Sequence, residues 1–348
     1  MSPYILSTLC LGLGLGTTLT FMSSHWLLAW MGLEMNTLAI LPLMAQYHHP
    51  RAIEASTKYF LVQATAAAVL LFATITNAWL TGQWEMQQMS HPLPTTMIVL
   101  ALALKIGLAP LHSWLPEVLQ GLDLTIGMVI STWQKLGPFA IILQLAPTNP
   151  TVVMLLGLTS TLVGGWGGLN QTQLRKLLAY SSIAHLGWMI LVLQFSPPLT
   201  LLALLTYLIM TISTFLIFKI NNSTNINALS TSWAKVPSLA TLTPLILLSL
   251  GGLPPLTGFL PKWLIIHELT KQGLPLAATV AALSALLSLY FYLRLSYAMT
   301  LTTAPNNLMG TTPWRLFPTL PLAPLASSVA LTIFMLPLAP AITTLLAP

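Results

Sequence analysis

The chain has 348 residues, of which 55% are apolar and only 5% are charged. Soluble proteins carry about 25% charged residues, so this composition cannot cover a water-facing surface and indicates an integral membrane protein. The net charge of +6 comes from twelve dispersed lysines and arginines, which argues against nucleic-acid binding, and the single cysteine, Cys10, excludes intrachain disulfides and cysteine-ligated metal centres.

Long apolar segments follow one another along the whole chain. A bilayer core about 30 Å thick takes about 20 apolar residues per helix, and these continuous runs lack the alternation of membrane β-strands. We predict an all-α, polytopic bundle of about 11 transmembrane helices in a single membrane domain, residues 1–348. The predicted helices are 3–22, 25–46, 56–80, 95–117, 123–147, 150–169, 174–195, 198–220, 238–270, 275–300 and 320–343.

The fourth and ninth segments contain a weak internal repeat. Residues 107–116 read GLAPLHSWLP and residues 252–261 read GLPPLTGFLP, an offset of 145 (252 − 107 = 145). Helices interrupted by Pro and Gly at matching positions of two halves indicate the ion pathway of a transporter, although chance similarity between two Leu/Pro/Gly-rich segments is the alternative. We expect both helices to be broken, a first repeat at 3–147, a second at 150–300 and a terminal helix at 320–343.

The loops differ strongly in positive charge. Lysines and arginines collect on the inner side of membranes, so we place the N-terminus inside and the C-terminus outside. The outer face receives Lys271 and little else. The inner face receives Arg51, Lys58, Arg175, Lys176, Lys219, Lys235, Arg294 and Arg315.

Several ionisable residues lie well inside the predicted helices. These are Glu34, Lys105, Lys135 and Lys262. An ionised group at mid-membrane costs about 2.5–3.5 kcal/mol on insertion scales, so such groups tend to be paired, hydrated and functional. Extension of the side chain toward the interface explains a lysine near a helix end, such as Lys271. It fits Lys105 and Lys135 poorly, and for these two we favour a functional role.

Lys105 and His112 are seven residues apart, which is two turns on one face of a helix, although the break at Pro110 will distort this relation. The protonation of a lysine in a low-dielectric site depends on nearby charge, so a carboxylate such as Glu34 could drive proton uptake and release. Histidine titrates near neutral pH and can relay protons. Together with Lys135, these residues suggest a mid-membrane proton wire.

Other features favour structural roles. Glu54 and Lys58 are four residues apart and suit an ion pair on one helix. His185 is more often a hydrogen-bonded interior histidine than a relay, and both readings remain open. Gly164 and Gly168 form a GxxxG pattern, which favours close helix packing.

The segment 105–117, KIGLAPLHSWLPE, preceded by Glu34 and followed by Lys135, resembles the antiporter-like, proton-translocating membrane subunits of respiratory complex I. The motif K-x-x-x-x-P-x-H-x-W-L-P is specific, and we expect few false matches. Length, composition and N-terminal start resemble the animal mitochondrial members across the whole chain. The full form of the family has fourteen helices, so about eleven here implies that the first three are missing.

The resemblance implies a role for each buried charge and for one histidine. Glu34 would pair with Lys105, which lies in a broken helix. His112 would be the connecting relay, and Lys135 would be the central lysine of the second half-channel. Lys262 would be the lysine at the outlet, again in a broken helix.

The resemblance also implies the activity, in which oxidation of NADH by ubiquinone is coupled to proton translocation across the mitochondrial inner membrane. Lys58 lies about where the family has an additional lysine. The chain itself would bind no cofactor, because NADH, FMN, the iron–sulfur clusters and ubiquinone belong to other subunits. Its partners would be other membrane-arm and supernumerary subunits, membrane lipids and protons, and its positive face would be on the matrix side, with the C-terminus on the intermembrane-space side.

Two alternatives remain open at this point. Free-standing cation/proton antiporters share the motif, and activity of the isolated chain in vesicles would favour that reading. A structural membrane subunit, whose buried charges serve only to specify helix packing, is the other alternative.

Overall fold

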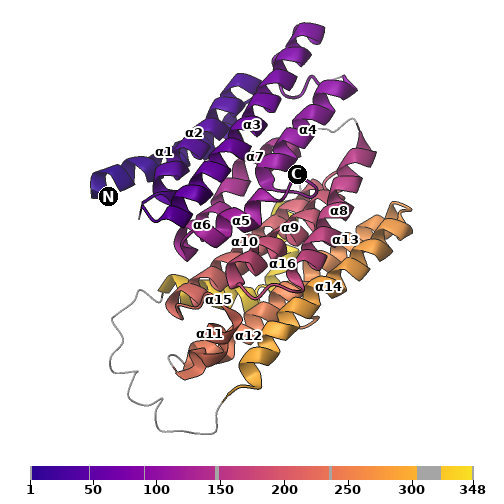
Figure 1. Ribbon diagram of the computed structural model, residues 1–348. Helices are drawn as coiled ribbons and strands as arrows, with labels where there is room; N and C mark the ends of the chain where they lie inside the picture. The colour runs from indigo at the N-terminus through magenta and orange to yellow at the C-terminus, as the bar shows by residue number, and fades with distance from the viewer. Residues whose placement is uncertain are drawn as a thin grey trace. The chain divides into compact units, whose positions relative to one another are not determined.

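The structure is a computed structural model that describes residues 2–46, 48–89, 91–145, 149–234, 237–303 and 323–346. Lys235, Arg315 and the predicted helix start at residue 320 lie outside the described residues. The described part is helical, with two isolated β-bridges and no strand, which confirms the all-α prediction (Figure 1). The helices are α1 (Pro3–Met22), α2 (Trp26–Met44), α3 (Pro50–Thr81), α4 (Pro92–Ile106), α5 (Trp114–Gly121), α6 (Leu124–Ser131), α7 (Trp133–Gln144), α8 (Pro150–Gly168), α9 (Leu174–Val192), α10 (Pro197–Ile220), α11 (Ile226–Ser230), η1 (Thr231–Ala234), α12 (Pro237–Gly251), α13 (Phe259–Lys271), α14 (Pro275–Thr300), α15 (Ala323–Phe334), η4 (Leu336–Leu338) and α16 (Ala339–Leu346).

Each of the eleven predicted segments contains a helix or a broken helix. Within the described residues, seven helices are long and apolar enough to cross a membrane, and a strongly bent C-terminal pair makes an eighth if it is one span. The predicted spans 95–117 and 238–270 are not among them, because each is divided into two shorter helices. The helix in 174–195 has sufficient length, but its composition is more polar because it begins with Arg175 and Lys176.

The chain divides into two compact units, Met1–Thr159 and Ser160–Pro348. In the first unit, α7 packs against α1, α2 and α4, while α3 packs against α2, α4 and α5. In the second unit, α10 is the central helix and contacts α9, α12, α13 and α15. Helices α2, α3, α4 and α7 therefore pack around one another within the first unit.

Small residues bring helices into close contact in both units. A Cβ atom built on Gly16 would lie 2.8 Å from the backbone oxygen of Gly32, so α1 and α2 touch through their backbones. A Cβ atom on Gly164 would lie 2.5 Å from the backbone nitrogen of Ala184, and one on Gly168 would lie 2.7 Å from the ring of Phe291. The predicted role of the GxxxG pattern in close packing is confirmed.

The breaks in the two repeated segments have the same backbone geometry. Gly107 ends α4 with φ +86°, and its N–H and that of Leu108 both donate to the Ala103 carbonyl at 2.9 Å. Gly252 ends α12 with φ +81°, and its N–H and that of the next residue donate to Leu248 at 3.1 and 3.3 Å. A positive φ favours glycine, because a side chain would clash in this conformation. The predicted breaks are confirmed at equivalent positions.

The predicted terminal helix 320–343 is not one straight helix. Its described part is α15 followed by α16, and the two are bent by 68° at a break of a few residues. Pro337 and Pro340 lie at this bend, and each lacks the N–H that a continuous helix would need. The continuous apolar pattern concealed the bend, although the prolines could have indicated it.

We predict that Gly164→Val lowers the free energy of unfolding by about 1–3 kcal/mol, because the added side chain meets the Ala184 backbone, which cannot yield as a flexible side chain can. The measurement is the temperature at which the detergent-solubilised protein loses its helical circular dichroism. The matched control is Gly14→Val, since no atom lies within 4 Å of a Cβ atom built there. Equal losses in both variants would contradict the close-packing explanation.

Candidate functional site

The C-terminal end of α4 is held by neutral hydrogen-bond donors. Breaking a helix leaves its last carbonyl groups without partners, and inside a membrane these groups need other donors. Trp114 Nε1 donates to the Leu104 carbonyl at 3.1 Å, and Gln63 Nε2 donates to the Lys105 carbonyl at 3.2 Å. Beyond the break, Thr159 Oγ1 donates to the Ala109 carbonyl at 3.1 Å. The broken end is therefore stabilised without using the charge of Lys105.

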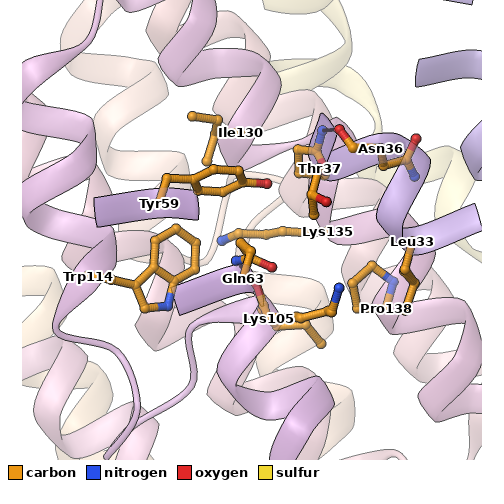
Figure 2. A pocket seen from close by; sticks show the side chains of 12 residues that line it. Leu33, Asn36, Thr37, Tyr59, Gln63, Lys105, Trp114, Ile130, Lys135 and Pro138 are labelled. Atoms are coloured by element: carbon orange, nitrogen blue, oxygen red, sulfur yellow. Dashed lines mark hydrogen bonds between the residues drawn. The ribbon is translucent and has the colours of Figure 1, made fainter. Parts of the chain in front are cut away.

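A small cavity lies inside the first unit, beside this broken end (Figure 2). Its volume of about 10 Å³ is enough for about one water molecule. Helices α2, α3, α4 and α7 supply most of its walls, together with α5 and α6. Its lining consists of Leu33, Asn36, Thr37, Tyr59, Gln63, Lys105, Ile106, Trp114, Ile130, Gln134, Lys135 and Pro138.

Two of the predicted site residues, Lys105 and Lys135, meet at this cavity. Lys105 is in the last turn of α4 and is 6% exposed, while Lys135 is near the start of α7 and is 2% exposed. The ammonium nitrogen of Lys105 has no hydrogen-bond partner among the described residues. In Figure 2 the two side chains extend in opposite directions, with the Lys135 nitrogen toward Trp114 and the Lys105 nitrogen toward Pro138. Tertiary folding has thus placed two buried lysines, 30 positions apart in the sequence (135 − 105 = 30), around one polar space.

Glu34 lies on α2 and is not one of the residues that line the cavity. It interacts electrostatically with Lys105 and with Tyr59, but it forms neither a direct ion pair nor a hydrogen bond with the lysine. One of its carboxylate oxygens is buried and has no hydrogen-bond partner in the part of the chain that the structure describes. An unpaired carboxylate near a buried lysine leaves the charge of both groups responsive to their surroundings.

His112 and Lys58 are placed elsewhere in the first unit. His112 lies in the turn between α4 and α5, with Nδ1 3.3 Å from the Pro110 carbonyl, and it does not line the cavity. The helical relation between Lys105 and His112 is lost because the break changes the chain direction. Lys58 forms the predicted ion pair with Glu54 at 2.7 Å and a second one with Glu117 at 2.9 Å.

Lys262 lies in the second unit and caps its own broken helix. Its Nζ donates to the Gly251 carbonyl, the last of α12, at 2.9 Å. A cation at the C-terminus of a helix is stabilised by the helix dipole. In the same unit, His185 of α9 packs against the ring of Tyr207, with centroids 5.7 Å apart.

The sequence alone did not single out the neutral polar residues of the cavity. Asn36 and Thr37 follow Glu34 on α2, while Tyr59 and Gln63 are one turn apart on α3 and both face inward. The available signal was the four-residue spacing of Tyr59 and Gln63 in an apolar helix, which places them on one face. Gln134 belongs to the same set, and its Nε2 donates to the Asn36 carbonyl at 3.1 Å.

Residues 23–288 match the family described as "NADH:quinone oxidoreductase/Mrp antiporter, TM", and residues 289–343 match "NADH dehydrogenase subunit 2 C-terminus". The chain is 73% identical over 345 residues to the NADH-ubiquinone oxidoreductase chain 2 of Tetraodon nigroviridis and 69% identical over 347 residues to that of Salmo salar. Each alignment covers 99% of both chains. The chain belongs to the NADH-ubiquinone oxidoreductase chain 2 family. This confirms the family resemblance seen in the sequence.

Solved structures agree with this membership. A chain of respiratory complex I from Thermus thermophilus has a TM-score of 0.89 and 30% identity, with 100% of this chain and 81% of that chain covered. A chain of the Mrp complex from a Dietzia species has a TM-score of 0.83, and 97% of this chain and 75% of that chain are covered. At 20% identity the second similarity shows the fold alone. The fold of the family is therefore the antiporter-like membrane fold that the sequence predicted.

We predict that Gln63→Met loosens the broken end of α4, because the side chain keeps its size but loses the hydrogen bond to the Lys105 carbonyl. A buried carbonyl left without its donor costs about 1–3 kcal/mol. Amide hydrogen exchange of Gly107 and Leu108 should therefore be faster by about fivefold or more. The control is Gln144→Met, which removes a longer bond at an exposed position. Unchanged exchange in Gln63→Met would show that the broken end does not depend on this bond.

Proposed function

We propose that this chain is a core membrane subunit of respiratory complex I, and that it couples electron transfer from NADH to ubiquinone to proton translocation through a mid-membrane relay. The observation that supports this most is the cavity that joins Lys105 to Lys135, with Glu34 in electrostatic contact with Lys105. Buried ionisable residues in membrane segments mark ion and proton pathways. The curated relatives in Tetraodon and Salmo carry the same name over nearly their whole length.

Within the relay, Glu34 and Lys105 form the pair whose protonation responds to a change in nearby charge. A change in charge beside Glu34 would alter how strongly Lys105 holds its proton, because no described group forms a hydrogen bond with that ammonium nitrogen. Lys135 then exchanges protons across the cavity. His112 would connect the relay beyond the α4 break, Lys262 would serve the outlet, and Lys58 is an additional, ion-paired lysine.

The chain contributes charge movement, whereas the redox chemistry belongs to its partners. We place NADH, FMN, iron–sulfur clusters and ubiquinone in other subunits, and we infer contacts with membrane-arm subunits, supernumerary subunits and lipids. The setting is the mitochondrial inner membrane. The excess of lysine and arginine on one face supports an N-terminus on the matrix side and a C-terminus on the intermembrane-space side.

Native-gel electrophoresis of detergent-solubilised mitochondrial membranes tests the assembly directly. The antibody-detected chain should migrate in a very large complex that also has NADH dehydrogenase activity. Migration alone or in a small oligomer without that activity would contradict the proposal and favour a free-standing antiporter. Vesicles containing the isolated chain provide the complementary measurement, in which no cation/proton exchange is expected.

We predict that Lys135→Met assembles but pumps protons poorly, because methionine fills the buried site and cannot bind a proton. The measurement is the number of protons translocated per NADH oxidised by vesicles that contain the assembled variant complex. The matched control is Lys271→Met, which replaces an exposed lysine at the end of α13 and should pump normally. Equal coupling in both assembled variants would indicate a purely structural role for the buried lysine.

A further inference from the structure

Among the neutral residues that line the cavity, Tyr59 carries a hydroxyl that is not bound to a backbone carbonyl. The other neutral donors are tied to backbone carbonyls: Thr37 Oγ1 donates to Glu34 at 2.8 Å, and Trp114 Nε1 to Leu104 at 3.1 Å. The side-chain amides of Gln63 and Gln134 are bound in the same way. Asn36, the remaining neutral polar residue, presents an amide that passes a proton far less readily than a hydroxyl.

No hydrogen bond joins the Tyr59 hydroxyl to another described residue, and Tyr59 lines the cavity although it is only 2% exposed. Buried tyrosine hydroxyls usually have a hydrogen-bond partner, and for this one a water molecule in the cavity would serve. Its ring is fixed edge-on against Trp114, with centroids 5.7 Å apart, and in Figure 2 its hydroxyl points into the space between Thr37 and Lys135. Tyr59 also interacts electrostatically with Glu34 of α2.

We propose that Tyr59 is a proton-relay residue, whose hydroxyl connects the Glu34–Lys105 pair to Lys135. This inference rests on the proposed function and adds a member to the relay. A hydroxyl can donate and accept a hydrogen bond at the same time, whereas an ammonium group can only donate. A hydroxyl between the two lysines would let a proton pass from one to the other without direct contact between their nitrogens.

In the transfer step, the ammonium group of Lys135 gives a proton to a lone pair of the Tyr59 oxygen, while the hydroxyl proton of Tyr59 passes to the neutral amine of Lys105. One O–H bond forms as another breaks, so the tyrosine is neutral before and after. The net change is one proton moved from Lys135 to Lys105, and the reverse step returns it. The cavity has room for about one water molecule, which would complete the hydrogen-bonded path.

The test is Tyr59→Phe in the assembled complex, because this change removes the oxygen and retains the ring that packs against Trp114. We expect normal assembly, and about a fivefold to tenfold slower rate of proton translocation in vesicles. The solvent deuterium isotope effect on that rate should also rise, which a merely structural defect would not cause. The matched control is Tyr290→Phe, an exposed tyrosine of α14, which should leave both quantities unchanged.

Comparison with Lys135→Met separates this inference from the proposed function. If Tyr59→Phe pumps normally while Lys135→Met does not, the relay stands and the role of Tyr59 is overturned. If both variants pump normally, the proposed relay through Lys135 is wrong. A high-resolution structure of the unaltered complex gives a second test that requires no variant. There, a Tyr59 oxygen out of hydrogen-bond reach of both lysines and of every water between them would overturn the proposal.

Discussion

The structure depends on hydrogen bonds to the last carbonyl groups of a helix that ends inside the membrane. The last carbonyl groups of α4 would be very costly in a lipid environment without donors. The carbonyls of Ala103, Leu104 and Lys105 accept from neutral donors, which are the N–H groups of Gly107 and Leu108 and the side chains of Trp114 and Gln63. Because these groups stabilise the break, the ammonium group of Lys105 is not needed there. It remains available to the cavity and to Glu34.

The second break uses its lysine differently. The backbone around Gly252 repeats the geometry around Gly107, but the last carbonyl of α12 is bound by the ammonium group of Lys262. A cation at this position is favoured by the helix dipole as well as by the hydrogen bond. The two broken helices therefore hold their lysines in different ways. The ammonium group of Lys262 is bound to a helix end, whereas Lys105 lines a polar cavity.

The lysines of the first unit fall into two groups with different physical environments. The ion-paired lysine Lys58 lies near the start of α3 with more than a third of its side chain exposed, where a pair of carboxylates compensates its charge. Lys105 and Lys135 are almost completely buried, and the ammonium nitrogen of Lys105 lacks a hydrogen bond. The cost of burying an ammonium group makes its proton sensitive to small changes nearby. That sensitivity is useful in a relay and has no evident value in a purely structural element.

Much of this protein was determined by its sequence alone. Apolar segments of membrane-spanning length determined the all-α membrane fold, glycine and proline determined the two breaks, and Glu34, Lys105 and Lys135 were recognisable because ionised groups are costly within such segments. Only the tertiary structure showed that Lys105 and Lys135 share a cavity while His112 does not line it, since helical spacing does not extend across a break. It also selected Tyr59, because a tyrosine in an apolar helix carries no sign of whether its hydroxyl is satisfied. That depends on neighbours from α2, α4 and α7, which are distant in the sequence and meet only when the helices pack.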